Sequence, residues 1–259
     1  SLTEAFAKIV DQISPEWFVM ENVDRAQQSE AYKKARTILK EAGYGLTEHI
    51  YDASLCGVPQ KRKRFICIGK KGETDGFLEQ IILDSEAKKP MTMRDYFGDS
   101  LGIEYYYRHP RNYNRRGFFS IDEPSPTIRG VNRPVPHGYT RHPNDPECLE
   151  GLRPLTTKER AQVQTFPKNF VLNGSKTDLE QIIGNAVPVK LAEFVARRIS
   201  DYRNKSNERC CDYMRSWLMD KKEMSAASAK DVISRINRVR CLTPIMHCDT
   251  AIDINYRLP

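Results

Sequence analysis

The stretch Trp17-Phe18-Val19-Met20, followed at once by Glu21-Asn22, decides the fold. Four apolar residues in a row suit a short strand that is buried on both faces, as in a parallel sheet. Glu21-Asn22 then stands at the C-terminal end of that strand, where open α/β sheets bind their ligands. A carboxyl in this setting can hold and deliver a proton, which makes Glu21 a candidate for chemistry. The alternative is that Glu21 and Asn22 only begin a loop.

The segments around this strand alternate between helix and strand. Apolar residues recur at helical spacing before it, and Ser14-Pro15 ends that pattern. After it, Ser29 is a typical N-cap and Gly43 a typical C-terminal stop for a second helix. Residues 46–51 and 64–68 have the pattern of two more strands. This alternation predicts an α/β layer.

Composition divides the chain into four predicted parts. Residues 1–71 hold the α/β layer. Residues 72–172 are rich in Pro, Gly, Arg, Asn and Tyr, so we expect a smaller, loop-rich domain there. Residues 173–202 return to a regular helix in which Pro188 suits the first turn. A polar stretch follows, and residues 203–259 form a basic helical extension.

The overall composition limits the class of protein. A formal net charge of +7 favours a polyanionic partner such as nucleic acid, although a basic protein without one is an equal alternative from charge alone. The sequence holds no apolar run of membrane-spanning length and does not start as a signal peptide, so we expect a cytoplasmic protein. Seven cysteines without a Cys-x-x-Cys pair favour reduced thiols over a disulfide framework or a metal site.

A basic segment precedes the last predicted strand of the layer. The two-residue period of a strand places Gln60, Arg62 and Arg64 on one face and Lys61 and Lys63 on the other. One face could then offer two guanidinium groups to a carboxylate, carbonyl or phosphate, while the other meets a DNA backbone. The simpler alternative is a solvated basic loop.

These segments together carry a resemblance. Glu21-Asn22-Val23, followed after a helix by Val58-Pro59-Gln60 and the two arginines, resembles two signature blocks of DNA cytosine-5 methyltransferases. Arg153-Pro154-Leu155-Thr156 resembles the next block, and Gly184-Asn185-Ala186-Val187-Pro188 resembles the last. The resemblance runs from residue 1 to about residue 202. It implies part of a Rossmann-like methyltransferase sheet beside a smaller target-recognition domain.

The resemblance also implies an activity. Enzymes of this family flip a cytosine out of a specific DNA sequence and methylate its C5 with S-adenosylmethionine. By resemblance, Glu21 would hydrogen-bond the base, and Arg64 would hold its carbonyl and orient Glu21. Further implied site residues are Arg62 beside the ring, Asn22 at the strand end, and Asn185, Ala186 and Val187 at the cofactor. Contacts to double-stranded DNA are expected from Gln60, Lys61, Lys63, Arg129, Asn132, Arg133 and Arg153.

Two segments of that family do not occur in the sequence: the Pro-Cys-Gln nucleophile block and the glycine-rich cofactor loop. We therefore expect S-adenosylmethionine to be bound mainly by an N-terminal part outside this chain. Three explanations stay open: a split enzyme whose partner chain carries the cysteine, a fragment of a longer enzyme, or a non-catalytic DNA-recognition module. Methylation of RNA is disfavoured by the long recognition region. We expect a prokaryotic or phage-encoded protein, and three roles stay open: restriction-modification, phage self-protection and housekeeping.

Overall fold

The computed structural model describes residues 1–110, 115–148 and 151–242, in two compact units, Ser1–Arg198 and Ile199–Pro259. The end of the predicted extension, residues 243–259, lies outside the described residues. No helix in the part of the chain that the structure describes is long and apolar enough to cross a membrane.

The first helix and the strand after it form as the sequence predicts. Helix α1 (Leu2–Ile13) ends at Ser14, which adopts a left-handed φ of 51° before Pro15. Strand β1 (Trp17–Val23) follows, and the short 3-10 helix η1 (Asp24–Gln28) leads to the next helix.

Helix α2 (Glu30–Glu41) has the predicted cap and stop. The side chain of Ser29 accepts a hydrogen bond from the Tyr32 N–H, which satisfies one of the free amides at the helix start. Gly43, with φ 83°, then turns the chain back toward the sheet.

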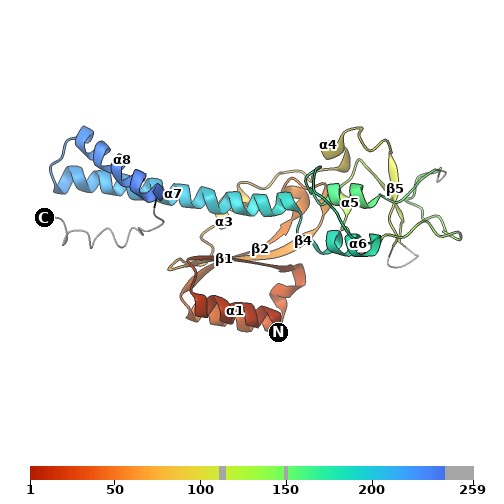
Figure 1. The fold of residues 1–259 in the computed structure, drawn as a ribbon, viewed down its shortest axis with the longest axis horizontal. Coiled ribbons are helices and arrows are strands. Elements are labelled where there is room, and N and C mark those ends of the chain that lie inside the picture. Colours follow the sequence, from red (N-terminus) through yellow and green to blue (C-terminus); the bar gives the residue numbers. More distant parts are fainter. Residues whose placement is uncertain (111–114, 149–150, 243–259) are drawn as a thin grey trace. The chain divides into compact units, whose positions relative to one another are not determined.

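The main sheet has three strands in the order β1-β4-β2, with β2 at Tyr44–Asp52 and β4 at Lys63–Lys71 (Figure 1). Strand β4 lies between the other two and is antiparallel to both. The parallel pairing expected for β1 is therefore wrong among these strands. The register pairs Val23 with Arg64, which brings the end of β1 to the start of β4.

The two faces of β1 have different surroundings. Phe18 and Met20 belong to a buried core with residues of α1 and α2, so both helices cover the same face. On the other face, Val19 is 45% exposed and Val23 is 52% exposed. The prediction that β1 is buried on both faces is thus wrong, because both neighbouring helices pack on one side.

The region after the sheet is loop-rich, as predicted. Strands β5 and β6 are antiparallel, β3 and β7 are parallel, and one core joins side chains from this region with those of α5 and α6. Between β2 and β4 lie η2 (Ala53–Leu55) and β3 (Gln60–Lys61). After β4 come α3 (Glu79–Leu83), α4 (Met93–Phe97), β5 (Tyr105–Tyr107), β6 (Phe118–Ser120), β7 (Ser125–Pro126), α5 (Thr157–Val163) and α6 (Lys176–Asn185).

The predicted boundaries at residues 71/72 and 172/173 do not separate compact units, since Ser1–Arg198 is one unit. The β3–β7 pairing explains this in part, because it joins Gln60 directly to Ser125.

The C-terminal helices also differ from prediction. Helix α7 (Val189–Lys221) runs without a break through the polar stretch where the sequence predicted an interruption, and α8 (Ala226–Leu242) follows. Residues 203–209 contain no Gly or Pro, so nothing in them ends a helix.

Cys210 is disulfide-bonded, which corrects the expectation of reduced thiols throughout.

Candidate functional site

An ion pair lies at the junction of β1 and β4. Arg64 Nε is 2.8 Å from Glu21 Oε1, with the side chains 15% and 33% exposed. The register pairs Val23 with Arg64, so the two-residue period places Glu21 on the same face, diagonally next to Arg64. The predicted meeting of these two groups is confirmed. A guanidinium fixed beside a partly exposed carboxylate can bind a planar polar ligand through both donors and acceptors.

The backbone around this pair is held by local hydrogen bonds. Asn22 Oδ1 accepts from the Val23 N–H at 2.8 Å, and Arg64 Nη1 donates to the Lys63 carbonyl at 2.8 Å. Asn22 pairs with Phe65 in the register, so it faces the side of the sheet opposite to Glu21. Asn22 therefore shapes the strand end and does not share the face of the ion pair.

Arg62 is buried, with 1% exposure. Its guanidinium donates to the carbonyls of Ile128, Gly184 and Ala186 at 3.0, 2.9 and 3.0 Å. Burial lowers the pKa of Arg62 to about 10, and repulsion from Arg64 adds to the effect, so the group stays charged at neutral pH. The predicted place of Arg62 beside a substrate ring is not met, because its donors bind the backbone of two other segments.

Gln60 is also an interior residue. It has no exposed surface, its Oε1 accepts from the Ile128 N–H at 2.9 Å, and its Nε2 donates to Gln164 Oε1 at 2.8 Å. The prediction that Gln60 contacts DNA is wrong, since a buried side chain with its amide so engaged cannot reach a duplex. The predicted alternation itself is confirmed, because Lys61 and Lys63 are exposed.

Gln164 completes this buried network and was not predicted as a site residue. Its Nε2 donates to the Ile183 carbonyl at 2.6 Å, near the end of α6. The only signal was its place in the block that follows Arg153, which says nothing about burial.

The segment predicted to contact a cofactor, residues 184–187, is held in place by close contacts within the fold. Gly184 lies so close to the recognition region that a Cβ there would be 2.2 Å from Gly130 N. The Ala186 carbonyl accepts from Arg62, so the backbone of Ala186 is structural. Asn185 is exposed and Val187 is half-buried, which leaves these two side chains in reach of a ligand.

The remaining predicted DNA contacts fall into two groups. Lys61, Lys63 and Arg133 are exposed cations. Asn132 Nδ2 donates to the Leu155 carbonyl at 2.8 Å, so that amide helps to hold the fold.

Arg153 is likewise engaged within the chain. Its guanidinium forms two 2.8 Å bonds with Glu159, whose carboxylate also takes part in the capping box of α5 with Thr156. Arg153 thereby stabilises the start of α5.

A buried ion pair between α5 and α6 was missed by sequence reasoning. Arg160 Nε is 2.5 Å from Glu180 Oε2, and both side chains are almost fully buried. Arg160 also donates to the Arg129 carbonyl, and Glu180 accepts from Asn132 at 3.3 Å. The pair thus fixes the loop 129–132. No pattern in the sequence marks the two residues as partners.

The free cysteines in the described part of the chain include two that are buried, Cys56 and Cys67. Burial raises the pKa of each thiol to about 12. Among the described residues, no group of three or more His, Cys, Asp or Glu side chains is arranged to hold a metal ion.

We expect iodoacetamide at pH 8 to modify the exposed Cys148 and to leave Cys56 and Cys67 intact in the folded chain. The thiolate is the reacting form, and a raised pKa keeps a thiol protonated until the pH approaches about 12. Peptide mass spectrometry measures each site, and the urea-unfolded chain is the control in which Cys56, Cys67 and Cys148 all react. Modification of Cys56 as fast as Cys148 would contradict the assignment.

Comparisons with known proteins place this site in a family context. The family model described as C-5 cytosine-specific DNA methylase matches residues 1–201. The chain is 57% identical over 203 residues to the Type II methyltransferase M.HindV of Haemophilus influenzae, covering 78% of this chain and 67% of that protein. It is 52% identical over 204 residues to M.HgiDI of Herpetosiphon aurantiacus, covering 79% and 66%. The chain thus spans about two thirds of these relatives.

Solved structures share the fold. A putative DNA modification methyltransferase encoded within an E. coli prophage has a TM-score of 0.53 at 18% identity, with 78% of this chain and 73% of that chain covered. The S. pombe Dnmt2 methyltransferase has a TM-score of 0.52 at 18% identity, with 75% and 70% covered. The fold is therefore that of an α/β methyltransferase.

Proposed function

Because the chain belongs to the C-5 cytosine-specific DNA methylase family, we propose that Glu21 and Arg64 hold a cytosine that is flipped out of double-stranded DNA while its C5 is methylated. The observation that carries the proposal is the 2.8 Å contact between Arg64 Nε and Glu21 Oε1 on the partly exposed face of β1. A carboxyl group can meet the ring N3 and the exocyclic amine of cytosine, and a guanidinium can donate to its O2.

The pair would act on the charge that develops in the ring. When a thiolate adds to C6 of the flipped base, electron density moves toward N3 and O2. Glu21 would hold a proton at N3, and Arg64 would donate to O2, so both stabilise the charged ring where it forms. Arg64 would also keep the Glu21 carboxyl in place through their ion pair.

S-adenosylmethionine would supply the methyl group, and this chain's contacts to it are proposed at Asn185 and Val187. Their side chains are exposed or half-buried, whereas the Ala186 carbonyl is already used by Arg62. The predicted contact of Ala186 with the cofactor therefore cannot use its carbonyl. Most of the cofactor site is proposed to lie on a segment outside this sequence.

The attacking thiolate is proposed to come from that segment as well. Cys56 and Cys67 are buried with a raised pKa of about 12, which is the reverse of what a nucleophilic cysteine needs. The relatives' description as Type II methyltransferases supports a restriction-modification role in a bacterial cytoplasm, with residues 72–172 contacting the DNA sequence.

We expect the purified 259-residue chain to transfer no methyl group to duplex DNA by itself. Transfer should begin when the chain is co-expressed with the part of M.HindV that it does not match, because that part would supply the thiolate and most of the cofactor site. Incorporation of tritiated methyl groups from S-adenosylmethionine into DNA measures both states. Below, "complemented chain" means this co-expressed pair.

Each outcome of that experiment has a distinct meaning. Transfer by the chain alone would contradict the proposed outside thiolate. If neither state transfers methyl groups while the chain still binds duplex DNA, the non-catalytic recognition module becomes the better account.

A further inference from the structure

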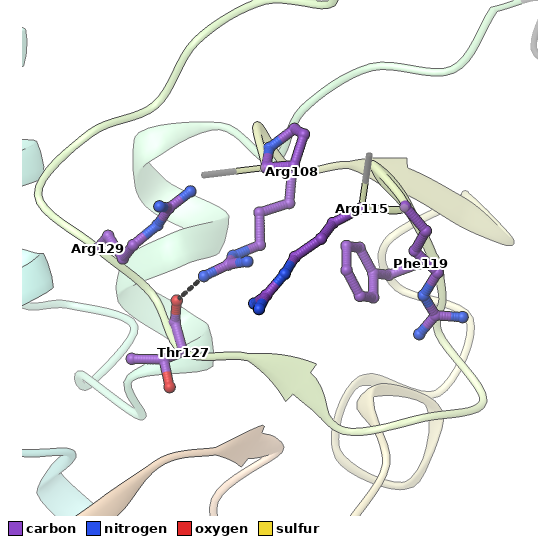
Figure 2. A pocket seen from close by; sticks show the side chains of 7 residues that line it. Arg108, Arg115, Phe119, Thr127 and Arg129 are labelled. Carbon is purple, nitrogen blue, oxygen red and sulfur yellow. Dashed lines mark hydrogen bonds between the residues drawn. The ribbon is translucent and has the colours of Figure 1, made fainter. Parts of the chain in front are cut away.

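A cavity of about 500 Å³ lies in the recognition region, within the unit Ser1–Arg198 and apart from the Glu21–Arg64 pair. Its wall contains four cations and no carboxylate, a composition that favours an anionic ligand. We call it the arginine pocket; its lining residues are Arg108, Pro110, Arg115, Arg116, Phe119, Thr127 and Arg129 (Figure 2).

Contacts within the fold hold two of the guanidinium groups in place. Arg108 Nη2 donates to the Thr127 carbonyl at 2.9 Å. The Arg116 guanidinium lies 4.3 Å from the centre of the Phe119 ring and pairs with Glu123 at 2.5 Å. These groups are therefore positioned before any ligand arrives, which lowers the entropy lost on binding.

Arg129 and Thr127, which also line the pocket, are fixed by contacts with other parts of the fold. Arg129 donates to the His109 carbonyl, and the Arg129 carbonyl accepts from Arg160 of the buried ion pair with Glu180. The Thr127 hydroxyl donates to the Lys61 carbonyl at 2.9 Å. The pocket wall is thus tied directly to the backbone of Lys61, which has an exposed side chain, as does Lys63.

Arg115 differs from the other three arginines. It is exposed, and within residues 1–110, 115–148 and 151–242 it has no hydrogen bond or ion pair. Figure 2 shows its side chain reaching toward that of Arg108, with the Phe119 ring beside it. Two guanidinium groups that point into one space repel each other unless an anion lies between them.

We propose that the arginine pocket binds a phosphate group of the DNA backbone, an inference that rests on the proposed function. A neutral base would leave the repulsion between the Arg115 and Arg108 guanidinium groups in place, whereas a phosphate accepts from several guanidinium groups at once. The hydrogen bond of Thr127 to the Lys61 carbonyl joins the pocket wall to the segment that carries the exposed Lys61 and Lys63. These two lysines can contact further phosphates of the same DNA strand.

The test uses the full 259-residue chain and the variant Arg115→Gln. Binding to two duplexes of unrelated sequence is followed by fluorescence anisotropy over a range of salt concentrations. We expect Arg115→Gln to lower the affinity for both duplexes by the same factor. It should also reduce the slope of log K against log salt by about 0.9, the value for one phosphate contact. Arg115→Lys should keep most of the slope.

A matched control removes one positive charge elsewhere. Arg215 lies on α7 and pairs with Asp212. The variant Arg215→Gln should leave the slope of log K against log salt unchanged. Because Arg115 is exposed, its replacement should preserve the circular dichroism spectrum.

A second arm uses inorganic pyrophosphate in place of DNA. Pyrophosphate should raise the midpoint of thermal unfolding of the wild-type chain and do so less for Arg115→Gln. If pyrophosphate stabilises the chain but DNA does not bind, the pocket still binds phosphate, and its ligand is a free phosphate compound. The proposed function on DNA would then be contradicted, independently of the pocket.

Three results would overturn the proposal that the arginine pocket binds a phosphate group. They are an unchanged salt slope and pyrophosphate response in Arg115→Gln, a loss of affinity for one of the two duplexes only, and a wild-type chain that responds to neither ligand. The second of these would indicate base recognition instead.

Discussion

Replacing Glu21 by Gln is expected to lower kcat/KM for methyl transfer by the complemented chain about 10²–10⁴-fold, the usual contribution of a positioned acid or base. Gln keeps the size of the side chain but cannot hold the proton that the ring needs at N3. The rate of tritiated methyl transfer measures the effect. Glu41→Gln is the matched control, since Glu41 is an exposed residue at the end of α2 and should have wild-type activity.

Arg64 provides the complementary variant. Arg64→Lys keeps the positive charge but loses the planar fork that contacts Glu21, so activity should fall as well. Because the two residues act as a unit, the double variant should lose less than the product of the two single losses. Wild-type kcat/KM in Glu21→Gln would refute the role assigned to the carboxyl.

Replacing Arg62 by Met is expected to lower the free energy of unfolding by about 2–4 kcal/mol. The Ile128 and Gly184 carbonyls would lose their Arg62 donor, and a buried unsatisfied acceptor costs about 1–3 kcal/mol. The Ala186 carbonyl would keep only its 3.4 Å bond from Gln164. Removal of the buried charge and local relaxation offset part of that sum. Urea denaturation, followed by circular dichroism, measures the change.

The neighbouring residue offers a control for Arg62. Lys63 is exposed, so Lys63→Ala should change the unfolding free energy by no more than about 0.5 kcal/mol. Equal stability of Arg62→Met and wild type would show that the three carbonyls find other donors. It would also contradict the structural role assigned to Arg62 in place of the predicted contact with the substrate.

The position of Arg62 has a consequence for function. It lies two residues before Arg64, and its guanidinium holds Ile128 in the recognition region and Gly184 and Ala186 beside Asn185. The strand that carries the proposed base-binding arginine is thus tied to the segments proposed to contact DNA and cofactor. A small displacement of any one segment would disturb the others, because close-packed interiors transmit strain.

Local features were predictable from the sequence because their causes are local. Ser14-Pro15 and Ser29 act on the adjacent turn, and they bound the helices as expected. The meeting of Glu21 with Arg64 was predicted from the family resemblance rather than from a local pattern, and the ion pair between them agrees with it.

Features that depend on distant partners were not predictable. The burial of Gln60 and Arg62 depends on Ile128, Gln164 and Gly184, which are more than sixty positions away along the chain. Period two correctly separated these residues from the lysines, but it could not say which face is interior. The antiparallel placement of β4 has the same cause, since strand order is decided by long-range pairing.

The most direct test of the central claim is a crystal structure of the complemented chain trapped on a duplex with 5-fluorocytosine at the methylated position. The account predicts the base outside the helix, with N3 within about 2.6–3.2 Å of a Glu21 oxygen and O2 at a similar distance from Arg64. A base held elsewhere, with Glu21 and Arg64 bound only to each other, would contradict it.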